Sequence, residues 1–314
     1  MIPKHLKDRF RQSLLDGSYN LLLGSGISTD SKNGNNQFLK SAENLRVDLC
    51  KITNTKENTS LTRAYNLLNP GQISSEITKA YSKCIPGPTV KNIPKFLWRR
   101  IFTFNIDDVL ENLYLNMQEK KQKLISLNFD DPFELTALRG EVQAIHLHGW
   151  VQRNANGYVF STAEYIKIIR TMNPWMHLLS EVLSTEAFII AGTSLNEVDL
   201  EFYLNHRTSE TPQKTKGPSI LIEPNPDAAT RADCLRHGLL LLECNLKEFM
   251  EWMRIEYPAP PSVYDLIVPD PSGIFSSSVK EVDFMHFFRS SKMASRFYRH
   301  RIDVLPILPR ATCP

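Results

Sequence analysis

Five short apolar runs, each stopping at glycine or polar residues, constrain the fold of this chain more than any other feature. They are Leu21–Ser28 (LLLGSGIS), Ile101–Asp107 (IFTFNID), Ala144–Gly149 (AIHLHG), Ala187–Leu195 (AFIIAGTSL) and Ser219–Pro226 (SILIEPNP). Such runs are typical of strands that are buried on both faces, and residues with helical apolar spacing lie between them. The sequence therefore predicts an α/β fold in which helices cover both faces of a parallel sheet. Because open parallel sheets bind ligands at the carboxyl ends of their strands, all five strand ends should face one crevice.

The first run ends in a glycine-rich loop. Gly24 and Gly26 allow a tight turn and a close approach of the backbone to a ligand, and a helix starting near Ser28 would point free N–H groups at a phosphate. The third glycine of a dinucleotide-binding loop is replaced by Thr29, and the Gly-Lys-Ser/Thr ending of a P-loop is missing. An ordinary turn between a strand and a helix therefore stays an alternative.

Three side chains at the next two strand ends are suited to chemistry on a ribose. Asn105 can hold a water or a sugar hydroxyl, Asp107 adds an acceptor, and a neutral His148 can take a proton near physiological pH. Each has a structural alternative: Asn105 as the N-cap of a helix starting at residue 106, Asp107 as a first-turn acid, and His148 as a core histidine. His146, two residues earlier on the same strand, is the main alternative to His148 as the group that takes the proton.

Composition excludes several classes of protein. The 314 residues are 42% hydrophobic and 23% charged, as in an ordinary globular protein, and no apolar run is long enough to span a membrane. The five cysteines are scattered and form no C-x-x-C pair, which argues against a disulfide framework or a zinc site. The N-terminus does not have the apolar core of a signal peptide, so a cytoplasmic location is expected.

The chain divides into two parts by composition. Residues 1–257 carry the alternating pattern, with a mostly helical insertion at about 37–98. Residues 258–314 are interrupted by prolines, and from Lys280 onward seven Lys and Arg stand against three acids. This basic part is expected to be a solvated appended segment or a linker to a further domain, and not a nucleic-acid site. We also expect the chain to be the N-terminal effector part of a longer protein.

Four of the motifs, taken together, resemble the sirtuin signatures in the sirtuin order. They are GSGIS at Gly24–Ser28, TFNID at Thr103–Asp107, LHG at Leu147–Gly149 and GTSL at Gly192–Leu195. The resemblance implies a Rossmann-like NAD-binding domain with a smaller helical module. Any one motif alone would be weak evidence, and for GTSL a tight turn is the alternative.

The resemblance also implies roles for individual residues. Asn105 and Asp107 would hold the nicotinamide ribose and its attacking group, and His148 would be the base. The phosphates would be cradled by Gly24, Ser25, Gly26 and Ser28, the dinucleotide lined by Gly192, Thr193 and Ser194, and the adenosine end contacted by Glu223 and Asn225.

Departures from the deacylating sirtuins point to a subtype. The zinc ribbon and the Pro-Asp-Phe-Arg segment are missing from the sequence, and Phe104 stands where those enzymes have glutamine. The stretch after His148 is similar to that of zinc-free sirtuin-like domains of bacterial anti-phage systems, which hydrolyse NAD+ to nicotinamide and ADP-ribose. We therefore expect a metal-free NAD+ glycohydrolase that forms a homo-oligomer and works with a downstream sensor or NTPase domain or a partner protein. A non-catalytic module that senses NAD or ADP-ribose, and a protein deacylase, are the alternatives.

Overall fold

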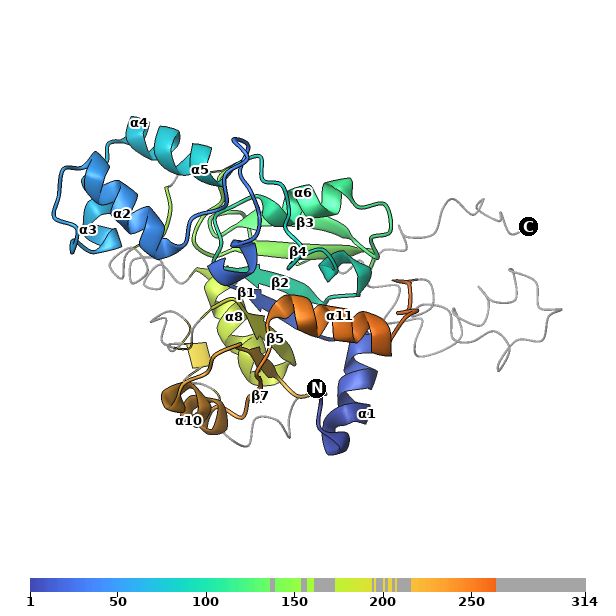
Figure 1. The fold of residues 1–314 in the computed structure, drawn as a ribbon. Coiled ribbons are helices and arrows are strands. Elements are labelled where there is room, and N and C mark those ends of the chain that lie inside the picture. Colours follow the sequence, from blue (N-terminus) through green and yellow to red (C-terminus); the bar gives the residue numbers. More distant parts are fainter. Residues whose placement is uncertain are drawn as a thin grey trace, which may run out of the picture.

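A computed structural model describes residues 1–135, 139–153, 157–160, 173–193, 195, 200, 203–204, 207 and 216–263. Within these residues the core is a seven-stranded sheet in which every pair of neighbouring strands is parallel (Figure 1). The strands are β1 (Asn20–Leu23), β2 (Arg100–Thr103), β3 (Lys123–Asn128), β4 (Glu141–His146), β5 (Phe188–Ala191), β6 (Ile220–Ile222) and β7 (Leu240–Leu242). The predicted α/β fold of the Rossmann type is confirmed.

The strand order is β3-β4-β2-β1-β5-β6-β7, so the chain leaves the central strand β1 in two opposite directions. Leu22 of β1 is in register with Phe102 of β2 on one side and with Ile190 of β5 on the other. In sheets of this kind the crevice lies where the order reverses, outside the carboxyl ends of the strands. The loops after β1, β2 and β5 therefore frame the expected binding crevice.

Side chains of the central strand alternate between two apolar cores. Leu21 and Leu23 pack into the core that also holds Phe10 and Phe249, whereas Leu22 packs into the core that holds Trp175. Both faces of the sheet are thus buried, which is why these strands read as continuous apolar runs.

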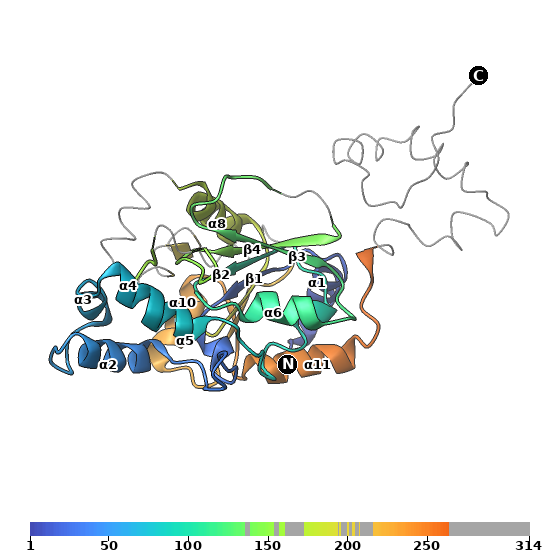
Figure 2. The ribbon, with the colours of Figure 1, turned by 90° about the horizontal axis from the view of Figure 1, so that it is seen from above.

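Helices cover each of the two cores. The first face is covered by α1 (Lys4–Leu15), α6 (Val109–Asn116) and α11 (Leu246–Glu256), and the second by α8 (Pro174–Thr185) and α10 (Ala228–Arg236). Figure 2 shows α8 on one side of the strands and α6 and α11 on the other. Helix α11 begins with a capping box: the Asn245 side chain accepts from the Glu248 N–H, and the Glu248 carboxylate accepts from the Asn245 N–H.

A group of short helices lies between β1 and β2, in the range predicted to be a helical insertion. It consists of α2 (Ala42–Ile52), α3 (Leu61–Tyr65), α4 (Pro70–Gln72), a π-helical turn (Ile73–Thr78) and α5 (Lys79–Tyr81). These helices lie together beside the sheet (Figures 1 and 2). Thr62 donates to the Phe160 carbonyl, and the Thr78 and Tyr158 hydroxyls are 3.1 Å apart. The group thus contacts the segment that follows His148.

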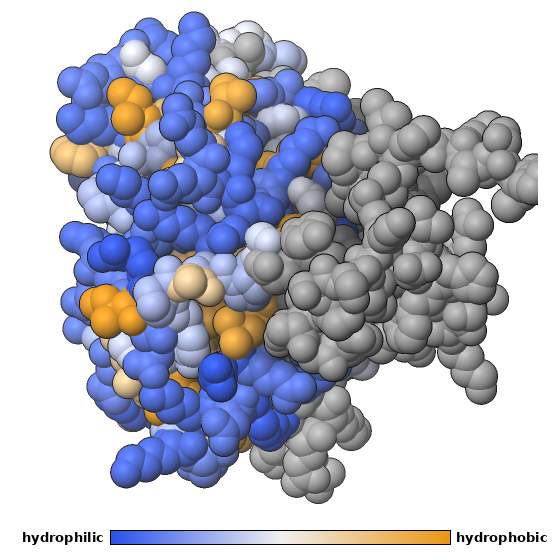
Figure 3. Space-filling model, turned by 90° about the vertical axis from the view of Figure 1, so that its right-hand side faces the viewer, coloured by the Kyte–Doolittle hydropathy of each residue, from blue (hydrophilic) through white to orange (hydrophobic). Residues whose placement is uncertain are grey.

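The surface seen in Figure 3 is mostly hydrophilic, with small hydrophobic areas that are separated from one another. Among the described residues, no helix is both long and apolar enough to cross a bilayer. The expected segment 258–314 lies outside the described residues from residue 264 onward.

Candidate functional site

The loops after β1 and β5 bond directly to each other. After β1 the chain forms a short 3-10 helix at Ser25–Ser28, and the Gly26 N–H donates to the Gly192 carbonyl over 2.8 Å. The Gly24 N–H donates to the Ala191 carbonyl over 2.9 Å. These two N–H groups are therefore committed to the neighbouring strand's loop.

Glycine is required on both sides of this contact. A Cβ on Gly24 would lie 2.4 Å from the Gly192 carbonyl oxygen, and a Cβ on Gly192 would lie 2.6 Å from the Ile27 nitrogen. Gly192 also has a φ of +71°, which L side chains rarely adopt. The glycines thus let two backbones meet at the rim of the crevice, and the exposed Ser25 and Gly26 form the outer part of that rim.

Thr193 follows this contact and is 4% exposed. Its Oγ1 atom is buried, and within the described part of the chain it has no hydrogen-bond partner. A buried hydroxyl without a partner is costly, so a ligand oxygen or nitrogen would be a favourable addition here. Ser194, predicted to line the same site, lies outside the described residues.

Asn105 is held at three points in the turn after β2. Its backbone N–H donates to Thr103 Oγ1 over 3.0 Å, and its side-chain Nδ2 donates to Ser28 Oγ over 3.0 Å. Its carbonyl oxygen lies 2.9 Å from His146 Nδ1. The remaining polar atom, Oδ1, is buried and has no partner among the described residues. The turn therefore presents one fixed acceptor that is available to a ligand.

Ser28 connects the glycine loop to both polar residues of that turn. Its hydroxyl accepts from Asn105 Nδ2 and hydrogen-bonds to the Asp107 carboxylate, which also accepts from the Val109 N–H over 3.1 Å. Burial raises the pKa of Asp107 to about 6, although the Val109 and Ser28 hydrogen bonds lower it. Asp107 is thus a carboxylate at neutral pH that protonates readily in mild acid.

The helix after this turn begins later than the sequence suggests. Helix α6 starts at Val109 with Asp108 at the N-cap position, so the interpretation of Asn105 as the N-cap is wrong. Asp107 precedes this N-cap and accepts the Val109 N–H, so the alternative of a first-turn acid is also wrong; the acid of the first turn is Glu111. The Asp108 carboxylate accepts from the Lys83 and Cys84 N–H groups, each over 2.8 Å, and ties the turn to the helical group.

The two histidines at the end of β4 differ in their surroundings. His146 is 1% exposed, and its ring nitrogens lie 2.9 Å from the Asn105 carbonyl and 2.9 Å from Glu111 Oε1. His148 is more exposed, and its ring centroid lies 4.8 Å from that of Phe104. A core histidine bonded to a backbone carbonyl is thus seen at His146, whereas His148 is half-buried.

Strand register brings Asn105 and His148 to the same edge of the sheet. Thr103 of β2 pairs with His146 of β4, and Asn105 and His148 each follow two residues later. Gly149 comes next with a φ of +100°, and a Cβ there would lie 2.9 Å from Tyr158 Cδ1. This glycine therefore lets the chain turn beneath Tyr158 directly after His148.

Glu223 and Asn225 lie two strands away from β1. They follow β6, and Glu223 Oε1 accepts from the Asn225 N–H over 3.3 Å. Glu223 is half-buried and Asn225 is exposed. They share the carboxyl edge of the sheet with the other predicted residues, but β5 lies between them and the Asn105 turn.

Part of the chain matches a known protein family. Residues 99–244 match the family model of the SIR2-like domain. The chain contains a SIR2-like domain. The matched range includes Asn105, Asp107, His148, Gly192 and Glu223, whereas the glycine loop precedes it.

Two solved structures are similar to the chain, both at low identity. One is a Sir2 homologue with a histidine-to-asparagine mutation in complex with ADP-ribose, at 13% identity and a TM-score of 0.42, with 82% of this chain and 97% of that chain covered. The other is a complex of a Sir2 homologue with NAD, at 15% identity and a TM-score of 0.38, with 78% of this chain and 92% of that chain covered. No curated protein sequence is similar enough to count as a match.

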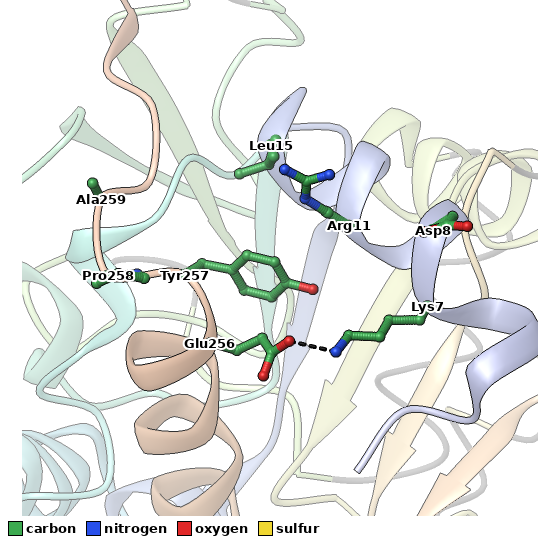
Figure 4. A pocket seen from close by; sticks show the side chains of 8 residues that line it. All are labelled: Lys7, Asp8, Arg11, Leu15, Glu256, Tyr257, Pro258 and Ala259. Carbon is green, nitrogen blue, oxygen red and sulfur yellow. Dashed lines mark ion pairs between the residues drawn. The ribbon is translucent and has the colours of Figure 1, made fainter.

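One pocket lies apart from the SIR2-like crevice. It is formed between α1 and the end of α11, where Lys7 and Glu256 form an ion pair of 2.5 Å beside Tyr257 (Figure 4). Leu15, which also lines it, precedes β1, so this pocket lies toward the amino ends of the strands. The predicted site residues do not line it.

Among the described residues, no group of three or more His, Cys, Asp or Glu side chains could hold a metal ion.

Sequence reasoning missed two residues beneath the crevice of the SIR2-like domain. Glu111 of α6 bonds to His146, and Ser126 of β3 donates to the same Glu111 oxygen over 2.5 Å. An acidic residue four positions after Asp107 was a visible signal for Glu111. Ser126 gave no signal, because only the pairing of β3 with β4 brings it close.

Proposed function

We propose that this chain is an NAD+ glycohydrolase that cleaves NAD+ to nicotinamide and ADP-ribose. The observation that carries the proposal is Oδ1 of Asn105, a buried acceptor that is fixed in place and has no partner within the described residues. An acceptor of this kind at the carboxyl edge of a SIR2-like domain is suited to holding a water or a ribose hydroxyl.

The chemistry requires little beyond positioning and charge. Breaking the bond between ribose C1 and the pyridinium nitrogen returns the bonding electrons to that nitrogen, so nicotinamide leaves neutral and the ribose becomes an oxocarbenium-like cation. Asn105 Oδ1 accepts from the attacking water, and His148 takes the proton that the water loses. Asp107, ionised above a pH of about 6, stabilises the positive charge that develops on the sugar.

The remaining predicted residues would bind the dinucleotide. We propose that Ser25 and Ser28, with the glycines beside them, contact the phosphates, and that Thr193 and Ser194 line the nucleotide. The Thr193 hydroxyl, for which no described residue is a partner, supports this role. Glu223 and Asn225 would contact the adenosine ribose, since an acid at such a strand end can accept from both hydroxyls.

The biological setting follows from the same resemblance. We propose that the chain depletes NAD+ as an effector of anti-phage defence in the cytoplasm, that it assembles into a homo-oligomer, and that it needs no metal. Residues 1–257 would form the catalytic unit, and residues 258–314 would connect it to a sensor or NTPase domain or to a partner protein.

Nicotinamide release from NAD+ by the full chain tests this proposal. We expect Asn105→Ala and His148→Ala to lower the rate by about 10²-fold or more, because each removes a group that acts on the water. Two exposed residues of the same types supply matched controls, Asn116→Ala and His177→Ala, and these should keep the wild-type rate. If both site variants were as active as the wild type, the assignments would be wrong.

Two further readouts separate the alternatives. Tight NAD+ binding in calorimetry, with no nicotinamide formed at high protein concentration, would indicate a sensing module instead. Release of acetate or O-acetylated product from acetyl-lysine peptides would indicate a deacylase.

A further inference from the structure

His146 lies directly beneath the turn that carries Asn105. It is the last residue of β4, pairs with Thr103 of β2, and is stacked on Trp150 with a centroid distance of 5.4 Å and an interplanar angle of 19°. Both ring nitrogens are engaged: Nδ1 with the Asn105 carbonyl and Nε2 with Glu111 Oε1, each at 2.9 Å.

These contacts fix the number of protons at this position. A carbonyl oxygen can only accept, so Nδ1 must carry a hydrogen. An ionised carboxylate also only accepts, so Nε2 must carry a second hydrogen, unless Glu111 itself is protonated and donates to Nε2. Either way, the His146–Glu111 pair holds one proton more than a neutral histidine beside a carboxylate. Ser126 donates to the same Glu111 oxygen and favours the form in which that oxygen is ionised and His146 is charged.

The charged groups around His146 act in the same direction. Burial alone lowers the pKa of His146, but the charge and hydrogen bond of Glu111, the Asn105 carbonyl and the nearby Asp107 carboxylate together raise it above its usual value. Trp150, which is stacked on the ring, is neutral, and so is Ser126, which bonds to Glu111. The pair therefore keeps its extra proton at a pH where a free histidine has lost it.

We infer that His146 is a positioning residue: the proton at Nε2 that it shares with Glu111 fixes the ring so that Nδ1–H donates to the Asn105 carbonyl, and this bond aims Asn105 Oδ1 into the crevice. This inference rests on the proposed function only in taking Asn105 as the group that acts on the water. When the proton is lost at high pH, the Nε2 lone pair faces a carboxylate, the ring can no longer satisfy both partners, and the hold on Asn105 weakens.

Glu111→Gln tests the inference sharply, because an amide can donate to Nε2 of a neutral ring. In that variant His146 keeps its Nδ1 hydrogen for Asn105 without needing a second proton. We expect the wild-type kcat for nicotinamide release to fall as the pH rises through the raised pKa of His146, and we expect Glu111→Gln to lose this basic limb while remaining active. His146→Gln should lower kcat by about 10²-fold with little change in KM, since misplacing a reacting group by about 1 Å costs this much.

A nitrogen-15 NMR titration of the full chain gives a readout that does not need activity. We expect the His146 ring nitrogens to titrate at a higher pH than those of a free histidine, the Asn105 side-chain amide signals to shift with them, and that shift to vanish in Glu111→Gln. If the Asn105 signals ignored the titration, or if His146 lost its proton at a lower pH than a free histidine, the inference would be wrong. If the NMR results are as expected but no nicotinamide forms, the inference stands and the proposed activity fails.

Discussion

The two sides of the crevice next to β1 are held together by different forces. On the β5 side, the loops at Gly24–Ser28 and Gly192–Thr193 meet through close steric contact between glycines. On the β2 side, the turn at Asn105–Asp108 is held by hydrogen bonds and by buried ionisable groups. On the β5 side, added atoms should lower the stability of the protein, and pH should have little effect. On the β2 side, isosteric changes should be tolerated, and the stability should depend on pH.

The largest effect is expected on the steric side. Gly24→Ala places a Cβ 2.4 Å from the Gly192 carbonyl oxygen, a contact that neither backbone can relieve without moving its strand. We expect a loss of about 4 kcal/mol or more in the free energy of unfolding, measured by urea denaturation. The control is Gly71→Ala, whose Cβ would approach only the Asn69 side chain, at 3.3 Å, and which should cost less than about 1 kcal/mol. Equal stability of the two variants would contradict the steric account.

A smaller effect of opposite sign is expected on the polar side. The charged form of Asp107 is penalised by burial, which raises its pKa from 3.8 to about 6. Asp107→Asn should therefore raise the free energy of unfolding at pH 8 by up to about 3 kcal/mol, at about 1.4 kcal/mol for each pKa unit, while lowering the proposed activity. Because the folded wild type binds its proton before the unfolded chain does, the wild type gains stability as the pH falls through 6, and the difference should shrink toward pH 4.

Asp108→Asn supplies the matched control for that prediction. Each Asp108 oxygen accepts a backbone N–H, from Lys83 and from Cys84, and an amide can supply only one acceptor atom. We therefore expect this variant to be less stable than the wild type at pH 8. A stabilised Asp108→Asn, or a destabilised Asp107→Asn, would remove the distinction drawn between the two acids.

The smallest effect is expected at Thr193, a residue of the β5 side that we propose to contact the ligand. Thr193→Val keeps the shape of a buried side chain but removes a hydroxyl that has no partner within the described residues. Stability should stay the same or rise by up to about 1 kcal/mol, while the Kd for NAD+ in calorimetry should increase about fivefold. Thr185→Val, at an exposed helix end, is the control and should leave the Kd unchanged. A clear loss of stability in Thr193→Val would mean that the hydroxyl has a protein partner.

Local pattern was enough to predict the strands and the residue types at their ends. Runs such as Leu21–Leu23 and Phe188–Ala191 are buried on both faces, and burial on both faces leaves a continuous apolar signal in the sequence. The start of α6 was placed wrongly, at residue 106 instead of Val109, because three residues of turn precede the helix and helix boundaries depend on such local bonding.

What the sequence by itself determined is the parallel α/β fold and the presence of Gly24, Asn105, Asp107 and His148 at strand ends. Only the tertiary structure decided that the two histidines have different surroundings, because Glu111 reaches His146 from a separate helix. It also decided that Ser28 bonds to both Asn105 and Asp107, across a separation of 77 residues in the case of Asn105. Strand order and helix packing create such contacts between distant segments, and no local pattern encodes them.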